Sequence, residues 1–413
     1  MTRAALVEGS ERVGLGRWRA ALVVAFFGTG LGMATWVTRT PSIRDVLGAS
    51  TAEMGLIIAG LSVGSVIGIG VGGLLVARRG ARFVVACGMS AIVAGVLVVG
   101  LGAGLSHGLV VATGLALFGY GMGSGEIGLN VEGVELEVAV GRSVVPGLHG
   151  CFSLGIFVGG LAGLAANAAA VPVLVHMATV TLLVGAGTVW LVGQLPARTG
   201  ATARTSGADP MRGAAVPRGQ RWPWFDARLL ALAAIILGMA LAEGSANDWL
   251  PLIVVDGYGL SESVGALVYA FFGLSMAVGR LTGGRVIDRF GRAPVMRTSA
   301  VVAAAGIAMV SFAPGPWLAA VGVLLWGLGA SLGFPVALSA AGDDPEHAAK
   351  RASAVATAGY AAFLVGPPIL GLLGEQVGLR AAILVVMVAV LATTLFSGAV
   401  RERPSPTHRE DPS

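Results

Sequence analysis

Two pairs of a glutamate and an asparagine stand four residues apart in stretches that are otherwise apolar: Glu126 with Asn130, and Glu243 with Asn247. In a helix this spacing puts both side chains of a pair on one face. A glutamate in apolar surroundings can exchange a proton, and an amide beside it can hold a polar solute or the carboxyl itself. The two pairs therefore predict solute binding and proton exchange, with a static hydrogen-bonded pair as the alternative.

Four further side chains are candidates for the same site. Arg39 could bind an anionic group or pair with one of the helix acids, and His149 could titrate near neutral pH. Trp36 and Tyr360 have the size and shape of a cavity wall. For each of these residues a purely structural role, in packing or in a fixed hydrogen bond, is the competing interpretation.

Other acidic residues stand near the expected ends of helices. Glu132, Glu135 and Glu137 follow Glu126 towards one end of the same apolar segment, and we expect them to be solvated charges. Asp248 and Trp249 are expected near the membrane surface, either as a capping carboxylate and an interfacial aromatic or as part of the site.

The motifs of several enzyme classes are absent. Gly68–Gly73 fits G-x-G-x-x-G, but the segment lies inside an apolar run with no preceding strand, which favours helix packing over dinucleotide binding. The sequence contains no G-x-x-x-x-G-K-[ST] loop, no cluster of metal ligands and no nucleophile beside a base. We therefore expect no cofactor, no metal and no enzymatic activity, and ATP is not expected as the direct energy source.

The composition identifies the class of protein. Of 413 residues, 55% are hydrophobic and 12% are charged, about half the charge content of a soluble domain. Charge-free runs cover Phe83–Gly125 and Gly150–Ala197, which are 43 and 48 residues long. Since a helix needs ~20 apolar residues to cross a bilayer, each of these runs must hold two spans. This predicts an all-α membrane protein that crosses the bilayer many times.

Breaks within the apolar runs raise the count to twelve spans. They lie at Gly104–Gly108, Ala168–Pro172, Asp256–Gly259 and Pro314–Pro316. The segment 198–226 is rich in Ala, Gly, Pro and Arg and is expected to be a linker. The predicted organisation is a six-helix bundle over 1–197, the linker over 198–226, a second six-helix bundle over 227–400, and a tail over 401–413.

Positive charges gather on one side of this arrangement. With the N-terminus in the cytoplasm, 23 of the 27 lysines and arginines fall on the cytoplasmic side. Only Arg39, Arg44 and Arg380 fall outside, and Arg280 stays within a helix. Because cytoplasmic loops carry an excess of Lys and Arg, we expect a multi-pass protein of the cytoplasmic (plasma) membrane, a cell inner membrane, with both termini in the cytoplasm.

The two halves of the sequence repeat each other. The matching pairs are Gly48 and Gly259, Ser50 and Ser261, Gly80 and Gly291 at an offset of 211, and Gly114 and Gly322, Gly119 and Gly327, Gly121 and Gly329 at an offset of 208. Parallel repeats of six helices imply two bundles related by an axis along the membrane normal, with a site between them at mid-depth.

A loop motif follows the second span of each half. The segment Gly284–Arg292 carries the complete pattern G-x-x-x-D-R-x-G-R, and in the first copy, Gly73–Arg82, Ala77 replaces the aspartate. With twelve spans, these loops resemble those of the major facilitator superfamily over essentially the whole chain. The resemblance implies two pseudo-symmetric bundles and solute transport, with loops that gate the cytoplasmic side or serve only as topology anchors. The loop residues expected to take part are Gly73, Arg78, Gly80 and Arg82, and Gly284, Asp288, Arg289, Gly291 and Arg292.

Three shorter matches resemble the fucose-permease-like sugar–proton symporters. They are Phe26-Phe27 with Gly32-Met33-Ala34, Glu126 with Asn130, and Phe334-Pro335. The resemblance implies that Glu126 belongs to a substrate and proton site and that Phe334 lies near it. That family carries an aspartate late in the first helix, where Arg39 stands here, so the identity of the solute and the proton stoichiometry stay open.

The expected function is secondary transport of a small solute by alternating access, coupled to protons. Uptake of a sugar-like solute by symport and efflux of a drug or metabolite by proton antiport are both compatible with the sequence. A transport-inactive membrane sensor is a remote alternative. The expected partners are the solute, protons and the lipid bilayer, with no nucleic acid, and the chain is expected to act as a monomer.

Overall fold

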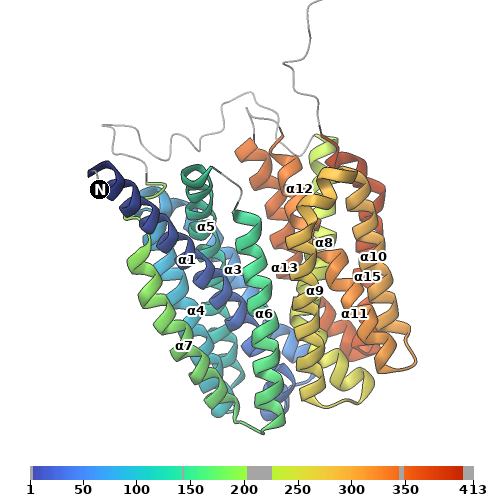
Figure 1. Ribbon diagram of the computed structural model, residues 1–413. Coiled ribbons are helices and arrows are strands. Elements are labelled where there is room, and N and C mark those ends of the chain that lie inside the picture. Colours follow the sequence, from blue (N-terminus) through green and yellow to red (C-terminus); the bar gives the residue numbers. More distant parts are fainter. Residues whose placement is uncertain (1–2, 142–143, 202–225, 344–347, 403–413) are drawn as a thin grey trace, which may run out of the picture.

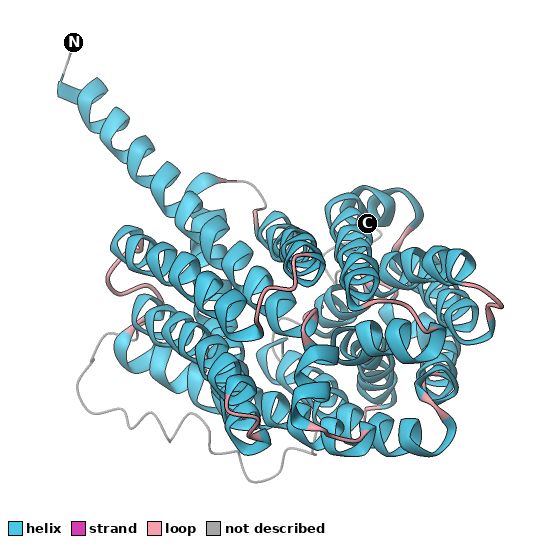
Figure 2. Ribbon diagram, turned by 90° about the horizontal axis from the view of Figure 1, so that it is seen from below, coloured by secondary structure: helices cyan, strands magenta, loops and turns pink. Residues whose placement is uncertain are grey.

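Helices joined by short loops make up the described part of the computed structural model, which covers residues 3–141, 144–201, 226–343 and 348–402 (Figure 2). Within these ranges the side chains of residues 3–13, 348–350, 352, 353, 356 and 360 are not described. The helices are α1 (Arg3–Val37), α2 (Thr40–Leu47), α3 (Thr51–Arg79), α4 (Ala81–Gly104), α5 (Gly108–Val140), α6 (Val145–Ala168), α7 (Val173–Gln194), α8 (Ala227–Tyr258), α9 (Glu262–Phe290), α10 (Arg292–Phe312), α11 (Pro316–Ala330), α12 (Gly333–Ala341), α13 (Ala348–Val377), α14 (Leu379–Ala382), α15 (Leu384–Phe396) and the 3₁₀-helix η2 (Ser397–Val400).

Twelve spans in the described ranges are long and apolar enough to cross a membrane, which confirms the predicted number. Six come before residue 198 and six after residue 226. The helices outnumber the spans because α2 is a short additional helix, because α11 and α12 form one span, and because α14, α15 and η2 form another. The protein is an all-α membrane protein with two six-helix bundles.

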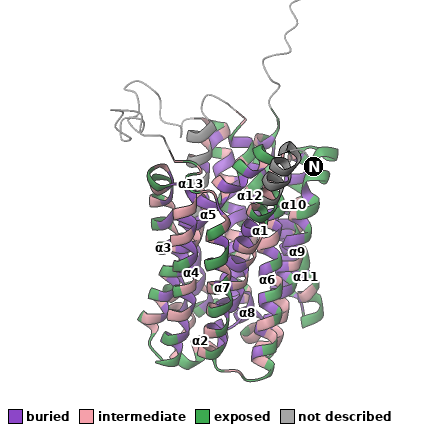
Figure 3. Ribbon diagram, turned by 60° about the vertical axis from the view of Figure 1, so that its left-hand side comes forward, coloured by how far each residue is buried: buried purple, intermediate pink, exposed green. Residues whose placement is uncertain are grey.

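The two bundles lie side by side, with α6 and α9 next to each other between them (Figure 1). The start of α1, the end of α7 and the start of α8 lie at the upper end of the molecule in this view, which we call the linker end. The opposite end carries α2 and the connections α6–α7 and α8–α9, and we call it the hairpin end. Buried residues concentrate inside the bundles and exposed ones on their outer faces (Figure 3). Exposed apolar side chains on those faces, such as Leu182 and Val189, are suited to contact lipid.

The sequence repeat corresponds to repeated helix ends. Ser50 and Ser261 are the N-caps of α3 and α9, and each side-chain oxygen accepts a backbone N–H of the first turn. Gly80 and Gly291 end the same two helices with φ of 86° and 80°. A residue with a Cβ rarely adopts such angles, so the glycines allow α3 and α9 to stop at the same point of each half.

A second group of repeated glycines allows helices to approach each other closely. A Cβ at Gly119 of α5 would lie 1.9 Å from the carbonyl oxygen of Leu61 in α3. A Cβ at the matching Gly327 of α11 would lie 2.0 Å from Ser275 Oγ in α9. Transmembrane helices that have glycine at the point of contact can approach each other closely and gain packing energy. Equivalent helices of the two bundles therefore pack in the same way.

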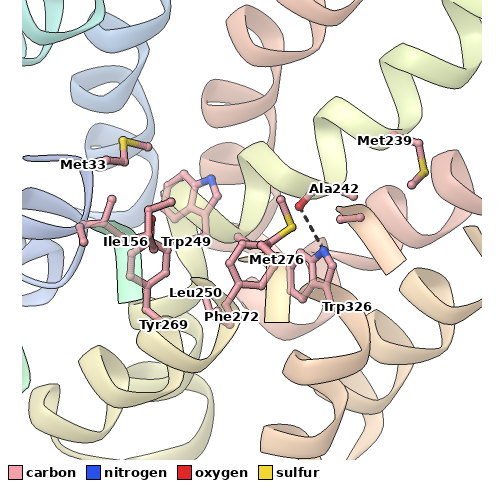
Figure 4. Packing of buried hydrophobic residues seen from close by; sticks show 14 of the residues in the cluster. Met33, Ile156, Met239, Ala242, Trp249, Leu250, Tyr269, Phe272, Met276 and Trp326 are labelled. Atoms are coloured by element: carbon pink, nitrogen blue, oxygen red, sulfur yellow. Dashed lines mark hydrogen bonds between the residues drawn. The ribbon is translucent and has the colours of Figure 1, made fainter. Parts of the chain in front are cut away.

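The core of the second bundle positions α8, α9 and α11 against one another (Figure 4). Trp326 Nε1 on α11 donates a hydrogen bond to the carbonyl oxygen of Ala242 on α8, at 3.1 Å. Phe272 on α9 contacts Trp326 edge to face, with ring centroids 6.0 Å apart, and stacks on Tyr269 at 6.3 Å. This buried aromatic cluster fixes the stretch of α8 in which Glu243 follows Ala242.

Candidate functional site

A charged group of side chains lies between the bundles at mid-depth. Arg280 on α9 donates from Nη2 to both carboxylate oxygens of Glu243 on α8, at 2.9 and 3.0 Å. Its Nη1 donates to Ser153 Oγ on α6, at 2.9 Å. The side chains of Arg280 and Glu243 are only 12% and 15% exposed. One guanidinium therefore holds an acid of its own bundle and a hydroxyl of the other bundle.

These residues share one layer of the molecule. Arg280 lies eighteen residues from Glu262, where α9 begins at the hairpin end. Ser153 and Glu243 each lie fifteen residues from the hairpin-end residue of their own helix. At 1.5 Å per residue these positions are about 22–27 Å from that end. They are near the middle of the helices, where ionisable side chains are costly and usually serve a function.

Glu126 on α5 lies at a similar depth in the first bundle. It too lies eighteen residues from the hairpin-end start of its helix, at Gly108. Its side chain is half-buried, and it interacts electrostatically with both Glu243 and Arg280. The site thus combines one permanent positive charge with two carboxyls. The three groups together are neutral when one of the two carboxyls is protonated.

The predicted partners of the two glutamates are engaged elsewhere. Asn130 Oδ1 lies 3.2 Å from His149 Nε2 on α6, and the His149 ring contacts Phe26 on α1 edge to face at 5.0 Å. Asn247 accepts a hydrogen bond from the Tyr269 hydroxyl at 2.9 Å. Each amide is one helical turn from its glutamate, and each is held by a neighbouring helix.

Arg39 lies away from the mid-depth acids, so its predicted pairing with one of them is not found. Its guanidinium donates to the Asn167 side-chain oxygen and, at 2.6 Å, to the carbonyl oxygen of Val171. Burial lowers the pKa of Arg39, and the charge of Glu262 acts in the opposite direction. Trp36, one turn earlier, is 1% exposed and belongs to the hydrophobic core.

Three residues expected at polar surfaces are buried. Asp248 and Trp249 are 5% and 0% exposed, because α8 continues beyond them to Tyr258 and is covered on both sides. Glu132, expected to be solvated, is fully buried close to Trp18 and Thr199. The first linker residues cover this end of α5, and the carbonyl oxygen of Thr199 accepts the N–H of Ala81 at 2.8 Å.

Two aromatic candidates come from the last helices of the second bundle. Phe334 on α12 is partly buried and lies beside Gly359 of α13. The side chain of Tyr360 is outside the described residues.

The loop-motif residues lie at the linker end. Arg78, Asp288 and Arg289 are exposed there. Arg292, by contrast, forms ion pairs with Asp343 at 2.7 Å and Glu402 at 3.6 Å. Of the remaining positions, Gly80 is buried, Arg82 is half-buried, and Gly73, Gly284 and Gly291 are exposed.

At the hairpin end, hydrogen bonds join the two bundles. Arg44 pairs with Asp256, and Glu262 accepts hydrogen bonds from the Ser42 hydroxyl and, through its backbone oxygen at 3.2 Å, from Asn167 Nδ2. Burial alone would lower the pKa of Arg44, but its hydrogen bonds to aspartates raise it. Between described residues, hydrogen bonds from one bundle to the other occur at this end and at mid-depth, and none occurs at the linker end.

Arg280 and Ser153 are not among the site residues predicted from the sequence. A signal for Arg280 was present, because it is an isolated arginine inside an apolar span. Ser153 had none, since a serine in a membrane helix commonly bonds its own backbone. In the described ranges, no three His, Cys, Asp or Glu side chains come together as metal ligands.

Comparison with known proteins places these features in a family. The family model described as "Major Facilitator Superfamily" matches residues 147–358 and 232–413. An uncharacterised MFS-type transporter of Yersinia pestis is 31% identical over 385 residues, which are 91% of this chain and 94% of that protein.

Solved structures share the fold. A mutant of the nucleoside transporter NupG has a TM-score of 0.72 at 15% identity, over 93% of this chain and 99% of that one. FucP, in its outward conformation, has a TM-score of 0.62 at 16% identity, over 93% and 99%. At such low identity these structures show the fold alone.

Proposed function

This chain belongs to the major facilitator superfamily and is a secondary transporter rather than an enzyme, and we propose that it carries a small polar solute by alternating access, coupled to protons. The observation that carries the proposal is the bridge formed by Arg280 between Ser153 of one bundle and Glu243 of the other. A site at mid-depth between two repeats is where a transporter of this architecture can be reached from either side in turn.

We assign the proton-coupling role to Glu126. A carboxyl that interacts electrostatically with Arg280 and Glu243 in a low-dielectric site changes the local charge by one when it takes up or releases a proton. That change alters the relative free energies of the two arrangements of the bundles. Asn130, His149, Glu243 and Asn247 are proposed to line the solute site from α5, α6 and α8.

The linker end is proposed to face the cytoplasm. The arginine distribution supports this orientation, with both termini inside. The proposed domain boundaries lie at residues 197, 226 and 400. We assign the structure to the state that is closed on the outside, since Arg44–Asp256 and the contacts of Glu262 join the bundles at the hairpin end. Closure at the linker end in the opposite state would bring the exposed Asp288 to a neighbouring helix end.

A two-step experiment tests this function. Purified protein is first screened by thermal unfolding against sugars, nucleosides, organic acids and cationic drugs, because a ligand that binds the folded state raises the unfolding temperature. Any stabilising compound is then tested in proteoliposomes with an imposed pH gradient of either sign. We expect accumulation that depends on the gradient, with the sign distinguishing symport from antiport. Flux that is indifferent to the gradient would exclude proton coupling.

A further inference from the structure

Arg39 is a buried cation at the hairpin end whose hydrogen bonds go to neutral groups. It is 4% exposed, and its guanidinium donates to the Asn167 side-chain oxygen and, at 2.6 Å, to the carbonyl oxygen of Val171. Its Nε is buried and has no hydrogen-bond partner among the described residues. An arginine keeps its charge at any pH a protein experiences. Because a buried charge without compensation is strongly unfavourable, Arg39 needs a negative charge nearby.

The other bundle supplies that negative charge. Glu262 is the first residue of α9, and its charge acts electrostatically on Arg39. Its carboxylate accepts a hydrogen bond from the hydroxyl of Ser42, which lies one helical turn beyond Arg39 on α2. Its backbone oxygen accepts a hydrogen bond from Asn167 Nδ2 at 3.2 Å. A carboxylate of the second bundle is therefore held by hydrogen-bond donors of the first bundle.

A histidine near Arg39 has unused hydrogen-bonding atoms. His176 on α7 is 7% exposed and lies close enough to Arg39 for the two side chains to interact electrostatically. Neither nitrogen of its ring has a hydrogen-bond partner among the described residues. Buried polar atoms without a partner are uncommon in folded proteins. The residues that we call the outer cluster all belong to the first bundle, and they are Arg39, Ser42, Asn167 and His176.

Building on the function and orientation proposed above, we infer that the outer cluster binds the carboxylate of an organic-acid solute when the hairpin end is open. In the closed state, Glu262 of the second bundle takes the place of that carboxylate. Opening the hairpin end removes Glu262 and leaves the donors of the outer cluster together on the outer side. A guanidinium with hydroxyl and amide donors binds carboxylates through charge-assisted hydrogen bonds. On closure, Glu262 returns to these donors and displaces the carboxylate of the solute.

This arrangement selects solutes by charge. A solute with a carboxylate replaces the negative charge that leaves with Glu262, whereas a neutral solute of the same shape does not. A ligand shifts an equilibrium between two states only by the difference in its affinity for them. A carboxylate that binds the exposed outer cluster therefore favours the open hairpin end. The implied substrate class is small organic acids rather than neutral sugars.

A distance measurement with acetate as the probe tests this, because acetate carries the same carboxylate as Glu262. Spin labels are placed at Leu109→Cys on α5 and Val377→Cys on α13, which are exposed positions near the hairpin end in different bundles. Cys87 and Cys151 are replaced by alanine. The full chain in lipid nanodiscs is studied by double electron–electron resonance while acetate replaces chloride at constant pH and ionic strength. We expect the ratio of long to short distances to rise with acetate, about tenfold at ten times the dissociation constant, and acetamide to leave it unchanged.

Two variants should change this response in opposite directions. Arg39→Gln removes the positive charge of the outer cluster and should abolish the response to acetate. Glu262→Gln removes the competing charge and populates the open hairpin end, so acetate should act at a lower concentration than in the parent. This second variant tests the inference even if Arg39→Gln does not fold. Arg44→Gln is the matched control: it removes a cation of the same end that pairs with Asp256, and it should keep the response to acetate even though its starting ratio differs.

The outcomes separate this inference from the proposed function. The outer cluster is not a carboxylate site if acetate leaves the distances unchanged in both the parent and Glu262→Gln, if acetamide acts as acetate does, or if Arg39→Gln responds as the parent does. A response confined to Glu262→Gln supports the inference, because the internal carboxylate then outcompetes acetate in the parent. A transported solute without a carboxylate would contradict the substrate class. Alternating access and proton coupling are tested by flux under a pH gradient, so they survive each of these results.

Discussion

Arg280 and Glu243 form an ion pair in which a single arginine nitrogen, Nη2, lies 2.9 and 3.0 Å from the two carboxylate oxygens. The pair joins α8 and α9 in the middle of the membrane-spanning layer, and both side chains are largely buried. Because the two charges are desolvated together, each one makes the other tolerable.

Removing one member of this pair should cost more than removing both. Glu243→Gln leaves the Arg280 charge without its nearest carboxylate, and we expect a loss of about 3–5 kcal/mol in the free energy of unfolding. The double variant Glu243→Gln/Arg280→Gln should lose clearly less. Unfolding in detergent, followed by tryptophan fluorescence, measures both; equal losses would show that the pair is not energetically coupled.

Glu126→Gln imitates a permanently protonated carboxyl. Because the variant cannot release a proton, it should still bind and exchange solute but lose accumulation driven by a pH gradient. Uptake in proteoliposomes, with and without the gradient, measures this once a solute is identified. Glu135→Gln, an exposed position on the same helix, is the matched control. Normal accumulation by the Glu126 variant would leave Glu243 as the next candidate for coupling.

Asp288→Asn should slow transport more than Ala77→Asn. The loop motif is complete only in the second half, and Asp288 is exposed in this state, free to form a charged hydrogen bond when the linker end closes. Losing such a bond costs about 1.5 kcal/mol or more, which corresponds to a decrease in rate of about tenfold. The measurement is the initial rate of solute exchange by each of the two variants and by the parent. If Asp288→Asn transports at the rate of the parent, Asp288 has no gating role.

The ion pair at the start of α8 should make stability depend on acid pH. Asp226 pairs with Arg351 at 2.6 Å and caps the helix by accepting the N–H of Arg228 at 2.9 Å. Burial acts to raise the pKa of Asp226, but the hydrogen bonds from Arg351 and Arg228 outweigh it and bring the pKa below its ordinary value of 3.8. The folded state therefore gains stability above that value and loses it as pH falls through the lowered pKa.

Asp226→Ala should accordingly cost about 1 kcal/mol at neutral pH, the usual value of an N-cap, and the cost should shrink in strong acid. Asp226→Asn keeps a capping oxygen and should lose less. Chemical unfolding of the three proteins across pH provides the comparison. A difference between parent and Asp226→Ala that is constant with pH would contradict this account.

The orientation in the membrane can be tested in the linker. Ser206→Cys, in a protein whose own cysteines are replaced, should react with a membrane-impermeant reagent only when the reagent has access to the cytoplasmic side. Ser206 lies outside the described residues, so this prediction depends on the arginine distribution alone. Labelling from the outside in intact cells would overturn the proposed topology.

The sequence by itself determined the number of spans, where they break and how the halves repeat. These are local properties: a bilayer sets the length of an apolar helix, and positions such as Gly80 and Gly291 need a positive φ wherever they occur. For the same reason the serine caps at Ser50 and Ser261 could be matched in the sequence before any packing was known.

Only the tertiary structure decided which side chains meet. The spacing of Glu126 and Asn130 places both on one face of a helix, but it does not determine which helix that face meets. Packing brings Asn130 to His149, Arg280 to Glu243 and Ser153, and Arg39 to Asn167, which is 128 residues away in the chain. Which side chains form a hydrogen bond depends on how the helices are arranged around one another. The residue types along a single helix do not determine that arrangement.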